Sequence, residues 1–168
     1  MKLNFGCGRD IKKGYVNVDI EPLEGVDEVW DLNIFPYPFK DESAEEILCI
    51  STLQIVKNVI KVVEEFHRIL KPGGLLFINV PHFTGTNLWK DLSHRRGFSY
   101  YAFEFFTNDL YYQTHKKFSK MKAKFEFGKK YAIWNYLIEW IANKWPHLYE
   151  DTPLRMFPAI NLDVELIK

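Results

Sequence analysis

A helix-like stretch that leads straight into a strand-like one sets the fold class of this chain. From residue 55 to residue 70 apolar side chains recur at helical spacing, with charged residues mostly on the other face. Pro72-Gly73-Gly74 ends that helix, and residues 75–80 follow as an apolar run typical of a strand buried on both faces of a parallel sheet. Another apolar run, at 44–50, precedes Ser51-Thr52, which we expect to cap the helix. The alternation of strand and helix predicts an α/β layer fold.

The N-terminal residues predict a glycine turn with a ligand above it. A short apolar strand at 3–5 runs into the turn, and residues 15–19 form a second strand soon after. Gly6 and Gly8 carry no Cβ, so the backbone can turn sharply there and come close to a ligand. Asp19 ends the second strand, where a carboxylate is placed to accept hydrogen bonds from the two hydroxyls of a ribose.

The remaining pattern predicts a short third strand, a polar loop and an aromatic C-terminal part. Pro146 ends the last predicted helix. In order, we expect a strand at 27–32, an extended loop with Pro36 and Pro38, a polar loop at 84–99, an aromatic helix at 100–106, an edge strand at 118–127, a helix at 131–145 and a final strand around 160–166.

Composition indicates one globular domain over residues 1–168, with 47% hydrophobic and 17% aromatic residues. The 22 acidic and 22 basic residues cancel, so no overall field favours nucleic acid or an anionic membrane. Cys7 and Cys49 suggest reduced thiols in a cytoplasmic protein. The sequence contains no metal-ligand spacing, signal peptide or membrane-spanning run.

Taken together, three motifs in this order resemble the Rossmann-like S-adenosylmethionine-dependent methyltransferases, in particular the type-11 methyltransferase domain group. The similarity covers nearly the whole chain. It implies a mostly parallel seven-stranded sheet with an antiparallel last strand and helices on both faces. The motifs are Leu3-Asn4-Phe5-Gly6-Cys7-Gly8, Gly14-Tyr15-Val16-Asn17-Val18-Asp19 and Glu65-Phe66-His67-Arg68-Ile69-Leu70-Lys71-Pro72-Gly73-Gly74.

The resemblance also implies a binding site for S-adenosylmethionine. It places the glycine turn beneath the methionine part, Asp19 on the ribose and Ile20 on the adenine face. Asp31 and Leu32 would meet the adenine edge, although Asp31 is equally well read as a turn former. The complete set of implied cofactor-binding residues is Phe5, Gly6, Cys7, Gly8, Asp19, Ile20, Asp31, Leu32, Ser51 and Leu53.

Several positions depart from the family pattern. Asn4 stands where the family usually has an acidic residue, and Asp10 stands where it has a third glycine. Relatives often have a Glu-His pair where this chain has Gln54-Ile55. Residues 9–14 are too few for a full crossover helix, so we expect a reduced N-terminal helical layer.

Two histidines and the loop around one of them are candidates for acid–base chemistry. His82 follows the fifth predicted strand, and His94 lies in a loop with Asp91 and Arg95 that resembles an Asp-Pro-x-His-Arg pattern of relatives. Each histidine is placed to remove a proton from an acceptor, with Arg95 binding that acceptor. The alternative is that Asp91 and His94 only hold the loop in place.

Two C-terminal stretches have open interpretations. Residues 116–130 carry seven lysines against one glutamate, which fits a phosphate or nucleic-acid stripe or, more simply, an edge strand protected against sheet pairing. The helix at 131–145 is aromatic around much of its circumference. Core packing or a homodimer interface would explain it, and shallow membrane binding beside the lysines is the other alternative.

The sequence therefore predicts a methyltransferase that uses S-adenosylmethionine on a small-molecule or sugar-like acceptor, at oxygen. A non-catalytic S-adenosylmethionine-binding module is the first alternative. The second is an interaction protein that uses the Lys-rich strand and the Trp-rich helix.

Overall fold

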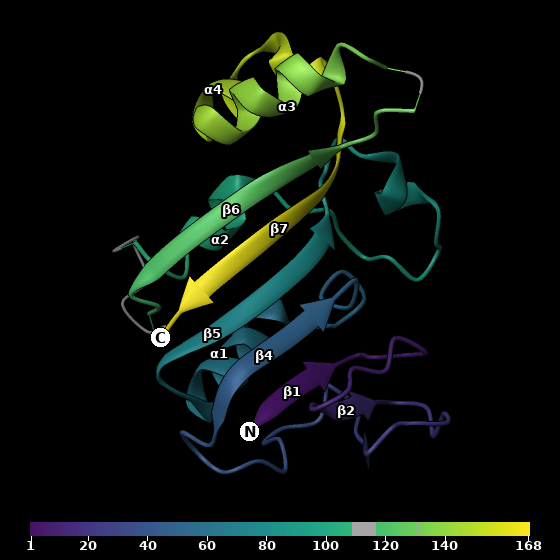
Figure 1. Ribbon diagram of the computed structural model, residues 1–168, viewed down its shortest axis with the longest axis vertical. Helices are drawn as coiled ribbons and strands as arrows, with labels where there is room; N and C mark the ends of the chain where they lie inside the picture. The colour runs from purple at the N-terminus through teal and green to yellow at the C-terminus, as the bar shows by residue number, and fades with distance from the viewer. Residues whose placement is uncertain (109–116, 131) are drawn as a thin grey trace.

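A seven-stranded sheet forms the centre of the computed structural model, which describes residues 1–108, 117–130 and 132–168 (Figure 1). The strand order is β3-β2-β1-β4-β5-β7-β6. The strands are β1 (Lys2–Phe5), β2 (Val16–Asp19), β3 (Glu28–Val29), β4 (Ala44–Ile50), β5 (Leu70–Pro81), β6 (Lys120–Phe127) and β7 (Ala159–Ile167).

Strands β1 to β5 are parallel, and β7 lies antiparallel between β5 and β6. This confirms the predicted sheet with its antiparallel last strand. Because β1, β2 and β4 run the same way, their carboxyl ends meet at one edge of the sheet, where ligands bind in open α/β sheets.

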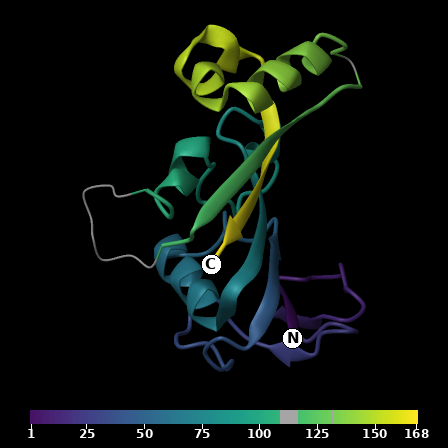
Figure 2. The same cartoon turned by 60° about the vertical axis from the view of Figure 1, so that its left-hand side comes forward.

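The helices lie mainly on one face of the sheet. α1 (Val59–Ile69) and α2 (Tyr100–Glu104) lie behind it in Figure 1 and to one side of it in Figure 2. α3 (Asn135–Lys144) and α4 (Pro146–Asp151) pack at the β6 edge. The opposite face carries loops in the described ranges, in line with the expected reduced N-terminal helical layer, and Leu48 and Phe77 stay half-buried there.

The missing layer follows from the short connections between β1 and β4, which are loops throughout. A polar network fills the space instead of a helix. Asn4 Nδ2 donates to Asn17 Oδ1 at 3.0 Å and to the Asp10 carbonyl at 2.9 Å, and the Lys12 amide donates to Asn17 Oδ1. Both asparagines are buried, so the loop after the glycine turn is held down by hydrogen bonds.

α1 begins later than predicted. Its cap is Asn58, which accepts from the Lys61 amide, because the Thr52 hydroxyl instead donates to the carbonyls of Ile50 and Gly6. The helix buries Phe66 against the ring of Phe5 at a centroid distance of 4.9 Å. Leu70 already belongs to β5, which starts before the Pro-Gly-Gly bulge.

The C-terminal elements also differ in their bounds. The helix predicted at 131–145 is α3, and Pro146 begins α4 rather than only ending a helix, since its fixed φ suits a first helical turn. The predicted edge strand starts at Lys120, and Lys116 and Tyr131 lie outside the described residues. Two 3-10 turns, Thr86–Trp89 and Pro153–Met156, complete the described elements. Among the helices in the described ranges, none combines the length and apolar character needed to cross a bilayer.

A clamp from α1 holds the loop between β3 and β4. Arg68 donates to both Glu65 oxygens, to Asp41 and to the carbonyls of Tyr37 and Phe39. Partial burial acts to raise the pKa of Glu65, but hydrogen bonds from Arg68 and the Tyr37 amide outweigh it and hold that pKa below its usual value. One guanidinium thus ties the helix to a loop that has no helix of its own.

We expect Arg68→Met to lower the free energy of unfolding by about 2 kcal/mol, because it leaves a partly buried carboxylate and two carbonyls without a donor. Because folding depresses the Glu65 pKa, this contribution is present above the unfolded pKa and is lost as pH falls through the folded one. Urea unfolding of the wild type and of Arg68→Met at neutral pH measures this difference in the free energy of unfolding. Lys61→Met, on the exposed side of the same helix, is the control, and equal losses for both variants would contradict the clamp.

Candidate cofactor cleft and acceptor loop

Two adjoining pockets lie at the carboxyl ends of β1, β2 and β4, and both are lined by Gly6 and Ser51. The first has a volume of about 200 Å³ and lies toward β2 and β3. The second, of about 280 Å³, lies over the residues that follow β1. Their linings are Gly6, Asp19, Ile20, Trp30, Asp31, Leu32, Asn33, Ser51, Thr52, Ile55 and Val56 for the first, and Asn4, Gly6, Cys7, Arg9, Asp10, Ile50 and Ser51 for the second.

Gly6 is where the turn after β1 comes closest to the loop after β4. Its φ is +67°, in the left-handed region that favours glycine. A Cβ on Gly6 would lie 2.2 Å from Thr52 Oγ1 and 2.4 Å from Thr52 Cγ2. The amides of Gly6 and Cys7 both donate to the Val18 carbonyl, which joins the turn to β2. The floor shared by the two pockets therefore requires a glycine.

Asp19 closes the turn from the other side. One carboxylate oxygen, Oδ2, accepts from the Gly8 amide at 2.7 Å, and Oδ1 accepts from the Glu21 amide at 3.1 Å. Each oxygen has further lone pairs, and the side chain lines the first pocket. The carboxylate is thus held in a fixed orientation and can still accept hydrogen bonds from a bound molecule.

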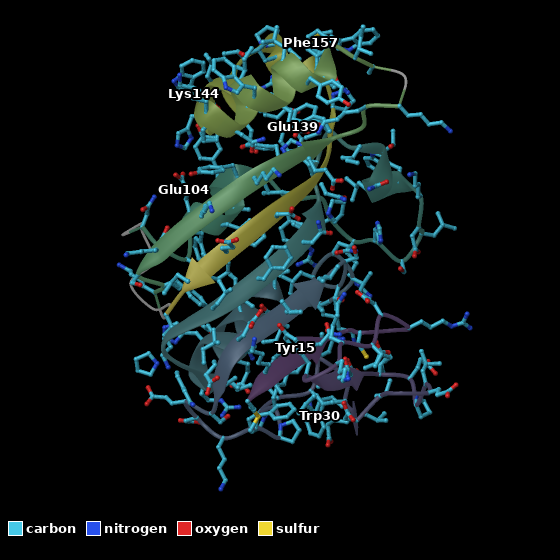
Figure 3. The ribbon with its side chains drawn as sticks, viewed as in Figure 1. Tyr15, Trp30, Glu104, Glu139, Lys144 and Phe157 are labelled. Carbon is cyan, nitrogen blue, oxygen red and sulfur yellow. The ribbon has the colours of Figure 1, made fainter. Side chains whose placement is uncertain are left out.

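The outer wall of the first pocket is apolar on two sides. Ile20, which is 59% exposed, and Trp30, which directly follows β3 and is labelled in Figure 3, both line this pocket. The Trp30 indole donates to the Ile34 carbonyl at 3.1 Å, which fixes the ring. Asp31 Oδ1 accepts from both nitrogens of Asn33, so it forms the turn considered as its alternative role while still lining the pocket.

Ser51 has an unusual backbone for a non-glycine residue. Its φ is +49°, its amide donates to the Asn79 carbonyl, and its hydroxyl donates to Asn79 Oδ1 at 3.4 Å. Asn79 Nδ2 in turn donates to Asp163 on β7. Such conformations persist where neighbouring structure holds them, and they cluster at functional sites.

The structure brings together most of the sequence-predicted cofactor residues and excludes two. Phe5 and Leu53 are fully buried, and Phe5 packs on the rings of Tyr37, Phe39 and Phe66, so neither reaches the pockets. Gly8 contributes through its hydrogen bond to Asp19. The lining residues that sequence reasoning missed are Asn4, Arg9, Asp10, Trp30, Asn33, Ile50, Thr52, Ile55 and Val56.

The polar loop docks on the segment that follows β4. The Arg95 amide donates to the Gln54 carbonyl at 2.9 Å, and Arg95 Nε donates to the Ile55 carbonyl at 3.0 Å. His94 Nδ1 lies 3.0 Å from the Leu88 carbonyl, and Gln54 Nε2 lies 3.4 Å from His94 Nε2. A carbonyl only accepts, so the proton belongs on Nδ1 and Nε2 keeps its lone pair.

Asp91 does not pair with the His94 ring. Its Oδ1 accepts from the Ser93 amide at 2.8 Å, and this hydrogen bond lowers the pKa of Asp91. The His94 amide donates to the Asp91 carbonyl, which closes a turn. Asp91 therefore shapes the loop that carries His94, as the alternative interpretation expected.

His82 is corrected to a packing role. Its ring is fully buried, Nδ1 accepts from the Thr84 amide, and Nε2 donates to Glu150 Oε1 at 3.0 Å. The same oxygen accepts from the Tyr100 amide at 2.6 Å. His82 thus joins β5 to α2 and α4, and its burial keeps it from the proton of an acceptor.

The cysteines are both free thiols. Burial raises the pKa of Cys49 to about 12 and also raises that of Cys7. Within the described ranges no group of three His, Cys, Asp or Glu side chains is placed to hold a metal ion.

Comparison with protein families shows what this chain is similar to. Residues 7–78, which include Gly8, Asp19, Ser51 and the whole of α1 but begin just after Gly6, match the family model of the methyltransferase domain. The matched residues, less than half of the chain, are therefore similar to a methyltransferase domain. The Rossmann-like methyltransferase resemblance found in the sequence is confirmed, and S-adenosylmethionine is the cofactor that this family implies.

Solved structures share the fold of this chain. A SAM-dependent methyltransferase from Archaeoglobus fulgidus is 16% identical and aligns over 99% of this chain and 85% of its own, with a TM-score of 0.66. One from Mesorhizobium loti is 14% identical, with 99% and 90% covered and a TM-score of 0.57. The YcgJ protein of Bacillus subtilis is 18% identical, with 99% and 91% covered and a TM-score of 0.56. No curated protein has a sequence that matches this one.

Proposed function

We propose that this chain transfers the methyl group of S-adenosylmethionine to a hydroxyl of a small-molecule or sugar-like acceptor. The observation that carries the proposal is the pair of pockets that meet at Gly6 and Ser51, with Asp19 held beside them. A long, bent ligand with a ribose between two arms suits that shape. The buried free thiols of Cys7 and Cys49 support action in the reducing cytoplasm.

The residues present fit the cofactor. Asp19 would accept from the ribose hydroxyls, and Ile20 and Trp30 would hold the adenine between them. In the second pocket the Arg9 guanidinium would meet the methionine carboxylate. A Cβ on Gly6 would overlap Thr52, so only a glycine lets the backbone of the turn pass beneath the ligand at this point.

Bound S-adenosylmethionine supplies a methyl group on a positively charged sulfur, which an oxygen nucleophile attacks in line. The protein's part is mainly to orient the acceptor and to take its proton. His94 has the tautomer that this requires, because the Leu88 carbonyl holds the proton on Nδ1 and leaves Nε2 as the basic nitrogen. Gln54 Nε2, which donates to that nitrogen, would give way to the acceptor hydroxyl.

An apolar cavity of about 470 Å³ adjoins the loop and supports an acceptor with an apolar part. Its walls are aromatic residues of α2 and its flanks, and Arg96 stands at its rim. The lining comprises Val59, Ile60, Arg96, Gly97, Phe98, Tyr101, Ala102, Phe103, Phe105 and Phe106. Arg95, whose Nη groups make no hydrogen bond within the described ranges, would bind the polar end of the acceptor.

Release of S-adenosylhomocysteine in the presence of a panel of polyols, sugars and hydroxylated aromatics tests the function. We expect turnover with a member of the panel and none without an acceptor. His94→Asn keeps a donor toward the Leu88 carbonyl but removes Nε2, so kcat should fall roughly 10²-fold, the low end for a general base because the methyl group is already activated. Affinity for the cofactor should not change.

Lys40→Gln serves as the control, since Lys40 is exposed and lines neither the two cofactor pockets nor the apolar cavity. It should retain full turnover. Full turnover by His94→Asn would contradict the role given to His94, and cofactor binding without turnover on any acceptor would favour a non-catalytic module.

A further inference from the structure

The C-terminal lobe, residues 132–157, carries an outward apolar face that the methyltransferase site does not use. Asn135, Ile138 and Ala142 turn one side of α3 into the domain. The other side is exposed, with Ile133 at 79%, Leu137 at 60% and Trp140 at 55%. The outer face consists of Ile133, Trp134, Leu137, Trp140, Trp145 and Leu148, and Met156 and Phe157 extend it. An apolar patch of this kind on a protein surface marks an interaction site.

The charge on this face has one sign. Lys144 Nζ lies 5.0 Å from the ring centre of Trp140 and 4.6 Å from that of Trp145, and it makes no ion pair within the described ranges. The carboxylates of the lobe point elsewhere. Glu139 brings no free negative charge to the outer face, because it accepts from the Phe127 amide and pairs with Lys129 at 2.9 Å beside β6.

The other two carboxylates of the lobe are also engaged away from the outer face. Glu150 is buried beneath α2, and Asp151 accepts from the Tyr101 hydroxyl. Figure 3 shows Lys144 and Phe157 on the outer part of the lobe and Glu139 toward β6. The face therefore offers aromatic rings and cations without a counter-charge.

A groove between α3 and β6 is lined by the same kinds of side chain, lysines and aromatic rings. It has a volume of about 600 Å³, and Lys122, Lys124 and Lys144 line it together with Tyr136 and Trp140. Its carboxylate, Glu139, already has its partners. Such a groove suits phosphate groups next to an apolar surface.

We propose that the outer face of the lobe docks on an anionic lipid bilayer. Tryptophan and lysine side by side suit the bilayer interface, where indole rings lie among the headgroups and ammonium groups meet lipid phosphates. The lysines of the groove meet the phosphates of the same surface. A second copy of the chain is disfavoured as the occupant, because a two-fold axis through this face brings Lys144 toward its own equivalent with no carboxylate between them.

Co-sedimentation with vesicles tests the proposal. We expect binding to vesicles of phosphatidylcholine and phosphatidylglycerol in equal parts, weaker binding to phosphatidylcholine alone, and loss of binding as salt is added. Lys144→Gln should weaken the vesicle partition coefficient about fivefold, the value of one lysine near an anionic surface. The double variant Trp140→Ala, Trp145→Ala should weaken it roughly tenfold or more.

Trp89→Ala and Lys40→Gln are matched controls, because both side chains are exposed outside the lobe and the groove. They should bind vesicles like the wild type, and thermal unfolding confirms that every variant is folded. Absence of vesicle binding by the folded wild type would overturn the proposal, as would equal losses in the controls. A dimer in gel filtration that Trp140→Ala converts to monomer, without vesicle binding, would assign the face to a second copy.

Discussion

Gly6→Ala is expected to abolish cofactor binding and to destabilise the fold. The added Cβ would lie 2.2 Å from Thr52 Oγ1, and φ of +67° is strained for alanine. Strain and overpacking together should lower the free energy of unfolding by about 3 kcal/mol. Because both pockets share Gly6 as their floor, we expect affinity for S-adenosylhomocysteine to fall at least about 10³-fold, since small misplacements at such sites have large effects.

Gly8→Ala is the matched control for that prediction. Gly8 also has a positive φ, +50°, but a Cβ there meets nothing within 4 Å. Only the backbone strain remains, so the loss of stability should be about 1 kcal/mol, and the amide that donates to Asp19 is kept. Chemical denaturation and calorimetric titration measure both variants. Equal losses of stability and affinity would show that contact with Thr52 is not what makes Gly6 necessary.

Asp19→Ala should reduce cofactor affinity about 10³-fold with a smaller loss of stability. Two charge-assisted hydrogen bonds to a ribose are each worth about 1.5–3 kcal/mol. The variant also removes the acceptor of the Gly8 amide, so the turn is less well held. Calorimetric titration measures the affinity, and urea unfolding measures the stability.

Asp31→Ala tests whether any carboxylate at the end of a strand would have the same effect. Asp31 spends one oxygen on the Asn33 turn and offers at most an edge contact to the adenine, so we expect a loss of about tenfold or less. If Asp31→Ala lowered cofactor affinity as much as Asp19→Ala, Asp19 could not be assigned as the residue that binds the ribose.

Sequence reasoning could place the centre of the candidate cleft at one edge of the sheet, because chain connectivity determines which residues follow the strands. Gly6, Asp19 and Ser51 each follow a strand, and parallel strands bring their carboxyl ends together. The same reasoning misplaced Phe5 and Leu53, which are core residues. Strand alternation could have excluded Phe5, since Leu3 and Phe5 share one face and both are apolar.

What sequence reasoning missed comes from contacts between distant segments. Trp30 lines the cleft because the β3–β4 loop folds back and its indole donates to Ile34, which no local pattern indicates. His82 follows a strand, as a base would, but its ring is buried and Nε2 donates to Glu150, 68 residues away in the chain. The helical period at residues 131–145 likewise did not distinguish the buried side of α3 from its exposed side.

The predicted bounds of the elements differ from the observed ones for local reasons. Ser51-Thr52 suits a helix cap by residue type, but Ser51 adopts a left-handed backbone and the Thr52 hydroxyl bonds backward. The reduced N-terminal helical layer was expected from the short connection after β1, and the connections that follow β1 and β2 form no helix. The buried Asn4–Asn17 pair replaces part of it.

Calorimetric titration of the wild type with S-adenosylmethionine and S-adenosylhomocysteine, repeated on Asp19→Ala, tests the cofactor cleft most directly. We predict saturable one-to-one binding of both ligands to the wild type and its loss in the variant. Absence of heat with a well-folded wild type, or binding that survives in Asp19→Ala unchanged, would contradict the assignment of this cleft.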